Sequence, residues 1–221
     1  MNTLTGLPLT EQLCDYVRGQ LPPADDVDLA LIEQTAALGA VVEMQVPPEQ
    51  VALLSILTAS LGARLVVEVG TFTGFSTLGL ARGLAAGGKV ITIDISEEWT
   101  AIAAEHWTRA GVRDRIDLRI GPAREQLAAL PPDADIDVAF IDADKVGYLD
   151  YWNLIVPRMR PGGLILVDNV LYGGEAADPD ATGNARAIRI FNDAVRLDDR
   201  VEAVLLPLFD GLTVARRANV G

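Results

Sequence analysis

Between residues 64 and 168 the sequence alternates short, β-branched apolar runs with segments of helical length, and this alternation limits the possible folds more than any other feature. The expected strands are 64–69, 89–94, 115–120, 135–141 and 162–168. The expected helices between them are 75–86, 97–110, 123–130 and 145–159. Strands that are apolar along their length and separated by helices form parallel sheets with both faces covered. The sequence therefore predicts an α/β domain with a doubly wound, Rossmann-like sheet.

The C-terminal end of the sequence departs from this alternation. A helix expected over 185–197 is followed by apolar runs at 200–208 and 212–216, joined at Asp210-Gly211. Two strands joined by so short a turn must be antiparallel. We therefore expect a seven-stranded sheet that is mostly parallel and ends in an antiparallel hairpin.

The N-terminal end has helical periodicity without strands. Helices are expected over 9–21, 25–38 and 47–61, and the third opens with Pro47-Pro48, which a first helical turn tolerates. We expect a single domain over 1–221, made of an N-terminal helical segment (1–62) and a Rossmann-like core (63–221).

Charge and composition argue against several classes of partner. The chain of 221 residues has 31 acidic and 18 basic side chains, a net charge of −13. Nucleic-acid binders gain much of their affinity by neutralising phosphates with Lys and Arg, so a nucleic-acid partner is disfavoured. Apolar runs fall short of the ~18 residues that span a bilayer, and no secretory signal is visible. With Cys14 as the one cysteine, these features predict a cytoplasmic protein without a membrane partner.

The first expected strand ends in a glycine turn, Glu68-Val69-Gly70-Thr71-Phe72-Thr73-Gly74. In doubly wound sheets, ligands bind beyond the carboxyl ends of the strands. Glycine lets the backbone pass close to a ligand where a β-carbon would collide, and the spacing differs from the G-x-G-x-x-G of dinucleotide sites. Glu68 would offer a carboxylate to the sulfonium and ammonium groups of S-adenosylmethionine (SAM).

The second expected strand ends at Asp94, where a carboxylate accepts hydrogen bonds from ribose hydroxyls. Ser96 is expected to cap the following helix, which would leave Asp94 free for the ribose. Glu68 and Asp94 together predict an adenosine-type cofactor. SAM is preferred, and NAD is left open at this point.

Three oxygen-bearing side chains follow the fourth and fifth expected strands: Asp142, Asp168 and Asn169. If these strands are neighbours, their carboxyl ends converge. Two carboxylates and an amide carbonyl suit Mg²⁺, or alternatively Mn²⁺ or Ca²⁺, rather than Zn²⁺. Such a cation can hold two vicinal hydroxyls of a small molecule and ease the loss of one proton.

Lys145 lies three residues after Asp142 at an expected helix start, so both side chains can face one cleft. It is the candidate general base. Taken separately, these residues could instead serve as helix caps, a turn and a solvated lysine. Their coincidence at two strand ends favours a catalytic site.

With these residues in place, the chain resembles the cation-dependent O-methyltransferases of the caffeoyl-CoA and catechol type, particularly the small bacterial members. The resemblance spans nearly the whole chain. Its landmarks are Met44–Gln50, Glu68–Thr77, Phe140–Lys145, Pro161-Gly162-Gly163, Asp168–Leu171 and Asp210–Thr213. It implies a class I methyltransferase fold and, in most members, a homodimer.

The resemblance also implies roles for individual residues. Met44 and Val46 would lie beside SAM, Ala123 would border the adenine, and Gly70 and Ser76 would join Glu68 at the amino-acid end of SAM. Asp142, Asp168 and Asn169 would bind the metal, Asp142 also lying next to the cofactor, and Lys145 would be the base. The candidate substrate contacts are Lys145 and Tyr172. Many relatives carry tryptophan at the position of Tyr172.

The leading hypothesis is thus a SAM- and metal-dependent O-methyltransferase acting on a hydroxyl of a small catechol-like or phenolic molecule. The alternatives are a tRNA hydroxyuridine methyltransferase of the same family, an NAD-linked oxidoreductase and a non-catalytic SAM-binding subunit. His106 is expected to be a structural residue, at the surface or half-buried. Trp99, Trp107 and Trp152 are expected to lie in the core or in an interface.

Overall fold

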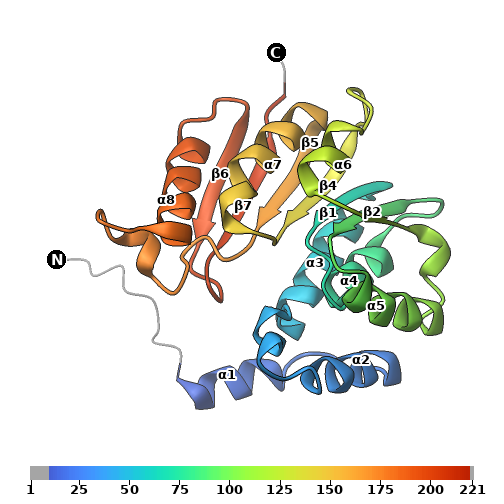
Figure 1. Cartoon of the computed structure of the whole chain (residues 1–221). Coiled ribbons are helices and arrows are strands. Elements are labelled where there is room, and N and C mark those ends of the chain that lie inside the picture. The colour runs from blue at the N-terminus through green and yellow to red at the C-terminus, as the bar shows by residue number, and fades with distance from the viewer. Residues whose placement is uncertain (1–9, 220–221) are drawn as a thin grey trace.

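The computed structural model describes residues 10–219, and within them seven strands form one sheet in the order β3-β2-β1-β4-β5-β7-β6 (Figure 1). The strands are β1 Leu65–Val69, β2 Lys89–Asp94, β3 Ile116–Ile120, β4 Ile136–Ile141, β5 Met159–Val167, β6 Val201–Leu206 and β7 Leu212–Arg217. Strands β1 to β5 are parallel, whereas β7 runs antiparallel to both β5 and β6. The predicted doubly wound sheet with a terminal hairpin is confirmed.

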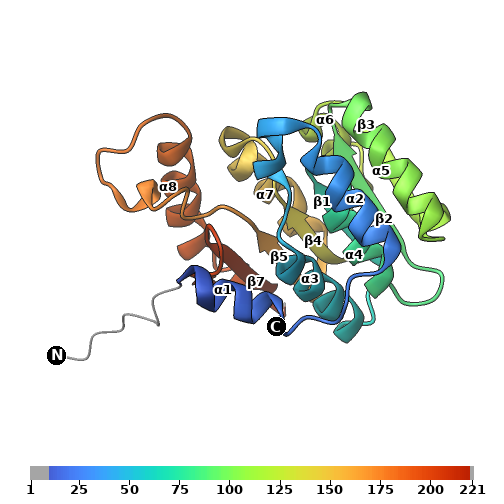
Figure 2. The same ribbon diagram turned by 90° about the horizontal axis from the view of Figure 1, so that it is seen from below.

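Helices cover both faces of the sheet (Figures 1 and 2). The α-helices are α1 Glu11–Arg18, α2 Asp26–Ala36, α3 Pro48–Ser60, α4 Phe75–Gly83, α5 Glu97–Arg109, α6 Ala123–Ala128, α7 Tyr148–Ile155 and α8 Gly183–Arg196. The 3₁₀ turns are η1 Gly39–Met44, η2 Arg113–Arg115, η3 Lys145–Gly147, η4 Val156–Arg158 and η5 Glu175–Ala177. Helices α6, α7 and α8 pack on one face, and α2 to α5 pack on the other.

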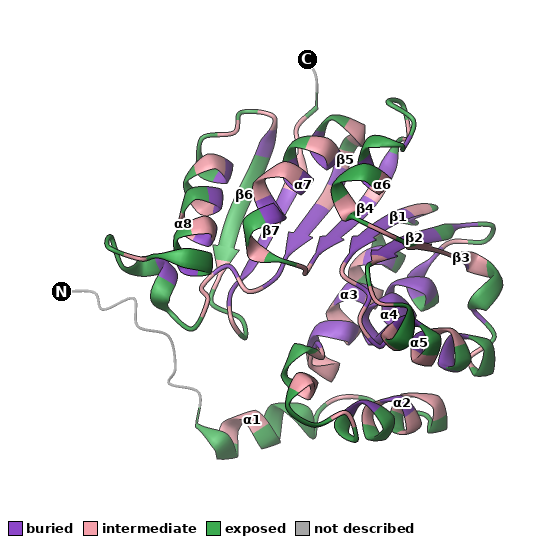
Figure 3. Ribbon diagram, viewed as in Figure 1, coloured by how far each residue is buried: buried purple, intermediate pink, exposed green. Residues whose placement is uncertain are grey.

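Alternating side chains of the buried strands supply both core layers. Val67 of β1 packs in the cluster that contains Trp152 of α7, whereas Val66 packs in the opposite cluster with Trp107 of α5. This two-sided burial is why the parallel strands are apolar at nearly every position. Figure 3 shows the central strands buried and the edge strand β6 largely exposed.

The prediction of a single helix over 145–159 is wrong in detail. The segment is divided into η3, α7 and η4, and Met159 is the first residue of β5. Pro157 has no backbone N–H to continue a helix, and Met159 pairs with Ile136 of β4. The register then shifts at the Pro161-Gly162-Gly163 stretch, so that Val138 pairs with Leu164. The predicted strand 162–168 therefore contained only the second part of β5.

The N-terminal helices are shorter than expected, and η1 was not predicted. Helix α1 begins at Glu11, where Thr10 caps it, and Leu9, the predicted start, lies outside the described residues. Turn η1 leads from α2 toward Pro47, the N-cap of α3. Between residues 10 and 219, none of the helices has the length and apolar character needed to cross a bilayer.

Candidate active site

A cleft with a volume of about 1020 Å³ opens at the carboxyl ends of β1, β2, β4 and β5, beside the point where the strand order reverses. The position is the expected one for a ligand in a doubly wound sheet. Every predicted site residue except Glu68 lines this cleft: Met44, Val46, Gly70, Ser76, Asp94, Ala123, Asp142, Lys145, Asp168, Asn169 and Tyr172. Their individual roles stay predictions.

The two glycines of the β1–α4 turn are required by the protein's own packing. A β-carbon at Gly70, whose φ is +96°, would lie 1.8 Å from the carbonyl oxygen of Asp142. One at Gly74 (φ +81°) would lie 2.6 Å from the ring of Trp107, whose Nε1 donates to the carbonyl oxygen of Gly74 at 3.0 Å. A β-carbon at either glycine would therefore collide with neighbouring protein atoms, and the lack of one at Gly70 lets the ends of β1 and β4 lie close together.

Asp94 organises the loop between β1 and α4. Its Oδ2 accepts hydrogen bonds from the backbone N–H groups of Thr71 and Phe72 at 2.9 and 2.8 Å, and its Oδ1 accepts from Ser96 N at 2.8 Å. Ser96 caps α5 as predicted, by accepting from Trp99 N. However, Asp94 is not free of protein partners, because it fixes the glycine turn as well as facing the cleft.

Glu68 lies beneath the cleft rather than on its wall. The side chain is fully buried, and Oε2 accepts hydrogen bonds from the hydroxyls of Thr77 and Thr92, the latter at 2.6 Å. Burial raises the pKa of Glu68 to about 7, although the Thr77, Thr92 and Ser76 hydroxyls act to lower it. Oε1 has no hydrogen-bond partner within the described part of the chain. A buried, unpartnered carboxylate oxygen is a suitable acceptor for an ammonium group.

Asp168 is the most firmly held of the predicted metal ligands. It is 4% exposed. Its Oδ1 accepts from Asn169 N at 2.7 Å, and its Oδ2 accepts from Nε2 of Gln50 at 2.8 Å. Its backbone oxygen accepts from the hydroxyl of Tyr148 at 3.0 Å.

Lys145 connects the other members of the cluster. Its Nζ donates to Oδ1 of Asp142 at 3.1 Å, to Oδ1 of Asn169 at 2.7 Å and to the hydroxyl of Tyr148 at 2.6 Å. The carboxyl ends of β4 and β5 thus converge as predicted, and the lysine at the start of η3 joins them.

Burial raises the pKa of both carboxylates in this cluster. The pKa of Asp168 is raised to about 6, first by burial and second by the charge of Asp142. Burial also raises the pKa of Asp142, against the effect of Lys145. Across residues 10–219 no three His, Cys, Asp or Glu side chains are grouped as metal ligands, and this candidate set combines two carboxylates with one amide. Such hard oxygen donors fit Mg²⁺ or Ca²⁺.

Comparison with known proteins identifies the family. The family model described as O-methyltransferase matches residues 25–218, most of the chain. The chain belongs to this O-methyltransferase family. A probable caffeoyl-CoA O-methyltransferase from Dictyostelium discoideum is 40% identical over 176 residues, covering 77% of this chain and 76% of the relative.

Solved structures of other O-methyltransferases share the fold of this one along nearly its whole length. An O-methyltransferase from Bacillus cereus, in complex with SAH, has a TM-score of 0.84 and 33% identity, and the alignment covers 92% of this chain and 96% of the other. A Streptomyces achromogenes O-methyltransferase involved in tomaymycin synthesis, in complex with SAM, has a TM-score of 0.88 and 28% identity, with 96% and 100% coverage.

The cleft of the O-methyltransferase includes residues that sequence reasoning missed. Trp99, expected in the core or an interface, lines the cleft and meets Phe72 edge-to-face with ring centroids 5.1 Å apart. Gln50 and Phe209 also line it. Phe72, Asn169, Tyr172 and Phe209 all have positive φ angles, of 50°, 54°, 49° and 53°. Left-handed backbone at bulky residues is uncommon and clusters at functional sites, but a sequence alone does not reveal it.

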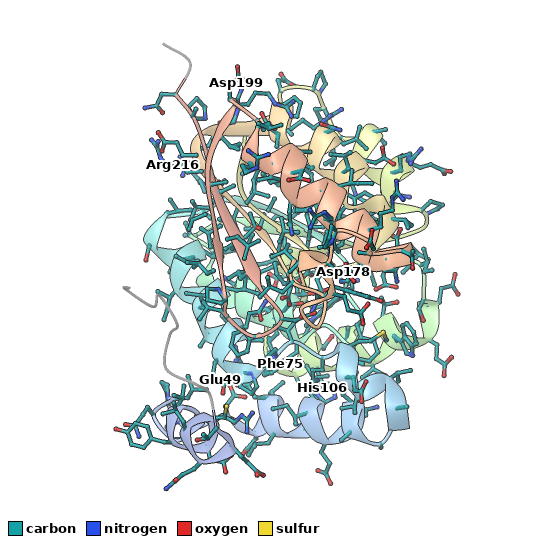
Figure 4. All side chains as sticks on the ribbon, turned by 90° about the vertical axis from the view of Figure 1, so that its left-hand side faces the viewer. Glu49, Phe75, His106, Asp178, Asp199 and Arg216 are labelled. Carbon is teal, nitrogen blue, oxygen red and sulfur yellow. The ribbon has the colours of Figure 1, made fainter. Side chains whose placement is uncertain are left out.

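His106 contributes to the fold outside the cleft. It is 1% exposed, more buried than expected, and its Nε2 lies 2.7 Å from Oε1 of Gln34. Figure 4 labels His106 above the N-terminal helices, where α5 meets α2. Trp107 and Trp152 are buried, as predicted.

Proposed function

We propose that this O-methyltransferase uses SAM to methylate a hydroxyl of a small catechol-like acceptor, with a divalent cation bound by Asp142, Asp168 and Asn169 and with Lys145 as the general base. The observation that carries the proposal is the convergence of these four side chains on the wall of the cleft that Asp94 also lines.

The methyl-donor half of the cleft has groups suited to each end of SAM. Asp94 keeps one lone pair, on Oδ1, for the ribose, because its other lone pairs accept from Thr71 N, Phe72 N and Ser96 N. Oε1 of Glu68 lacks a partner in the described residues and is a suitable acceptor for the ammonium group. Ala123, at the start of α6, would border the adenine. The relatives whose structures contain SAH or SAM support SAM as the methyl donor. Bound SAM supplies an electrophilic methyl group.

The acceptor half would hold the cation and the hydroxyl that is methylated. Asp142, Asp168 and Asn169 offer three oxygen ligands, and an octahedral shell has room for further oxygens. A bound divalent cation would hold vicinal hydroxyl oxygens of the acceptor and favour loss of a proton. Lys145, acting as the neutral amine, would take that proton on the lone pair of Nζ, while its two N–H groups donate to the Tyr148 hydroxyl and to Oδ1 of Asn169.

Aromatic side chains support a flat acceptor. Tyr172 and Phe209 both line the cleft. Their loops are joined by a hydrogen bond from Leu171 N to the backbone oxygen of Asp210 at 2.8 Å and by one from Gly173 N to Oδ1 of Asp210 at 2.6 Å. Aromatic faces bind planar rings through stacked or edge-to-face contacts.

The direct test is incubation with SAM and a panel of catechols and monophenols, with EDTA or with added Mg²⁺. We expect methylation of vicinal diols that EDTA abolishes and Mg²⁺ restores. Asp142→Ala should lose metal binding while its affinity for SAH stays close to that of the wild type. Undiminished turnover after complete chelation would reject the role of the cation, and methyl transfer confined to monophenols would reject the catechol-like acceptor.

A further inference from the structure

Gln50 has a polar amide side chain at a buried position of α3. It lies in the first turn of α3, with all of its side chain buried. The other buried residues of this helix are Val51, Leu54 and Thr58. Val51 and Leu54 belong to an apolar core cluster, and the Thr58 hydroxyl bonds within the helix. Burial of an amide without compensating hydrogen bonds costs about 1–3 kcal/mol, so packing alone would favour leucine or methionine at this position.

The amide has a specific partner across the fold. Nε2 of Gln50 donates to Oδ2 of Asp168 at 2.8 Å, over a sequence separation of 118 residues. Asn169 N donates to the other carboxylate oxygen. Each oxygen of Asp168 therefore accepts one N–H, which fixes the plane of the carboxylate and leaves a lone pair on each oxygen.

We propose that Gln50 is a positioning residue of the cation site, which orients Asp168 for metal binding. The inference rests on the proposed function, because it concerns the cation that Asp142, Asp168 and Asn169 would bind. Metal-ligating carboxylates are themselves held by hydrogen bonds, and loss of such a partner typically weakens metal binding by ~10–100-fold.

The second polar atom of the side chain points to the same role. Oε1 of Gln50 is buried and has no hydrogen-bond partner among the residues that the structure describes, although Gln50 lines the cleft. A buried carbonyl oxygen is rarely left unpaired in a folded protein. A bound cation would bring water into the cleft as a hydrogen-bond donor for this oxygen, so that Gln50 would hold Asp168 through Nε2 and solvent through Oε1.

The test uses Gln50→Leu, which keeps the volume and removes both polar atoms, and Thr58→Val as the matched control. Thr58 is also fully buried on α3, but its hydroxyl donates to Leu54 O within the helix. The Mn²⁺ affinity of each protein, saturated with SAH, is measured from the electron paramagnetic resonance signal of the free ion. Calorimetry gives the SAH affinity, and thermal unfolding confirms folding.

We expect Gln50→Leu to raise the Kd for Mn²⁺ by ~10–100-fold, with SAH affinity changed less than about twofold and Thr58→Val close to wild type. Should Gln50→Leu not fold, Gln50→Met, whose flexible side chain fills the same space, provides the same measurement. A folded variant with wild-type Mn²⁺ affinity, or an equal loss in Thr58→Val, would overturn the role of Gln50 and leave the proposed function intact. A wild-type protein that does not bind Mn²⁺ would overturn the cation site itself.

Discussion

Nζ of Lys145 lies within 3.1 Å of hydrogen-bond acceptors on three other residues: Asp142, Tyr148 and Asn169. If the lysine removes the acceptor's proton, Lys145→Ala should lower kcat by ~10²–10⁴-fold. Its effect on SAH affinity should be small, because in the proposed function the lysine serves the acceptor side of the cleft. Steady-state kinetics with a catechol acceptor and calorimetry with SAH measure the two quantities.

The chain's other lysine, Lys89, provides the matched control. It is exposed at the start of β2, so Lys89→Ala removes the same charge far from the hydrogen-bond network of Lys145. Its kcat should equal that of the wild type. A Lys145→Ala enzyme with unchanged kcat would remove this residue from the role of base.

Glu68 gives a prediction about pH. Burial raises the pKa of its carboxyl from 4.5 to about 7 in the folded protein, so the native state binds this proton more tightly than the unfolded chain does. The stability linked to this group is therefore present below pH ~4.5 and is lost as the pH rises toward ~7, by about 3 kcal/mol in total. The ligand-free protein should become less stable over this range.

Comparison with Glu68→Gln isolates the effect from that of other carboxyls. The amide cannot ionise, and the Thr77 and Thr92 hydroxyls can still bond to it. Urea unfolding of both ligand-free proteins between pH 4.5 and 8 should show the free energy of unfolding of the wild type falling relative to the variant. Parallel pH profiles would mean that Glu68 is already ionised across this range.

Among the structural elements, the turn between β1 and α4 depends most on glycine. Gly74→Ala would introduce a methyl group 2.6 Å from the Trp107 ring, at a φ of +81°. Left-handed backbone costs a non-glycine residue about 1–2 kcal/mol, and overpacking of a rigid core adds about 1–3 kcal/mol. We expect the free energy of unfolding of Gly74→Ala to fall by about the sum of these two costs, measured by urea unfolding.

Gly62→Ala separates the two contributions. Gly62 also has a left-handed backbone (φ +59°), but a β-carbon there would meet no atom within 4 Å. The free energy of unfolding of Gly62→Ala should fall only by the cost of the left-handed backbone, about 1–2 kcal/mol. Equal losses in both variants would show that the contact with Trp107 relaxes at little cost.

The elements that sequence reasoning predicted best are those with a clear pattern. β1, β2 and β4 are buried at most positions, so their apolar runs stand out, and the carboxyl ends of parallel strands lie together by topology. The convergence of Asp142, Asp168 and Asn169 followed from this. The start of β5 was missed because its pairing shifts at Pro161-Gly162-Gly163, and a helical signal ran directly into it.

Residues brought to the cleft by tertiary packing could not be predicted in the same way. Gln50 lies on a helix whose docking against the end of β5 leaves no periodic trace in the sequence. Trp99 was expected in the core or in an interface because its position in α5 does not show from the sequence whether it faces the core or the cleft. The left-handed backbone of Tyr172 and Phe209 likewise depends on contacts between two loops.

At the scale of the whole molecule, the helices differ in how far they are buried. Helices α4 and α7 are packed into the core, whereas α1 contains no buried residue in the isolated chain. It contacts α3 through Arg18, whose Nε lies 3.2 Å from Oε1 of Glu49, the residue labelled near α1 in Figure 4. An amphipathic helix with so little burial gains stability chiefly from a partner.

We predict that the partner is a second copy of this chain, with α1 in the interface, as the family resemblance implies. Tyr16 and Val17 are 64% and 44% exposed on α1. Light scattering should give twice the chain mass of 23.6 kDa, and replacing both residues with glutamate should yield monomers, because the paired helices would then bury like charges. Leu197→Glu is the control, since Leu197 is 71% exposed at the end of α8. A monomeric wild type, or a double variant that remains dimeric, would exclude this interface.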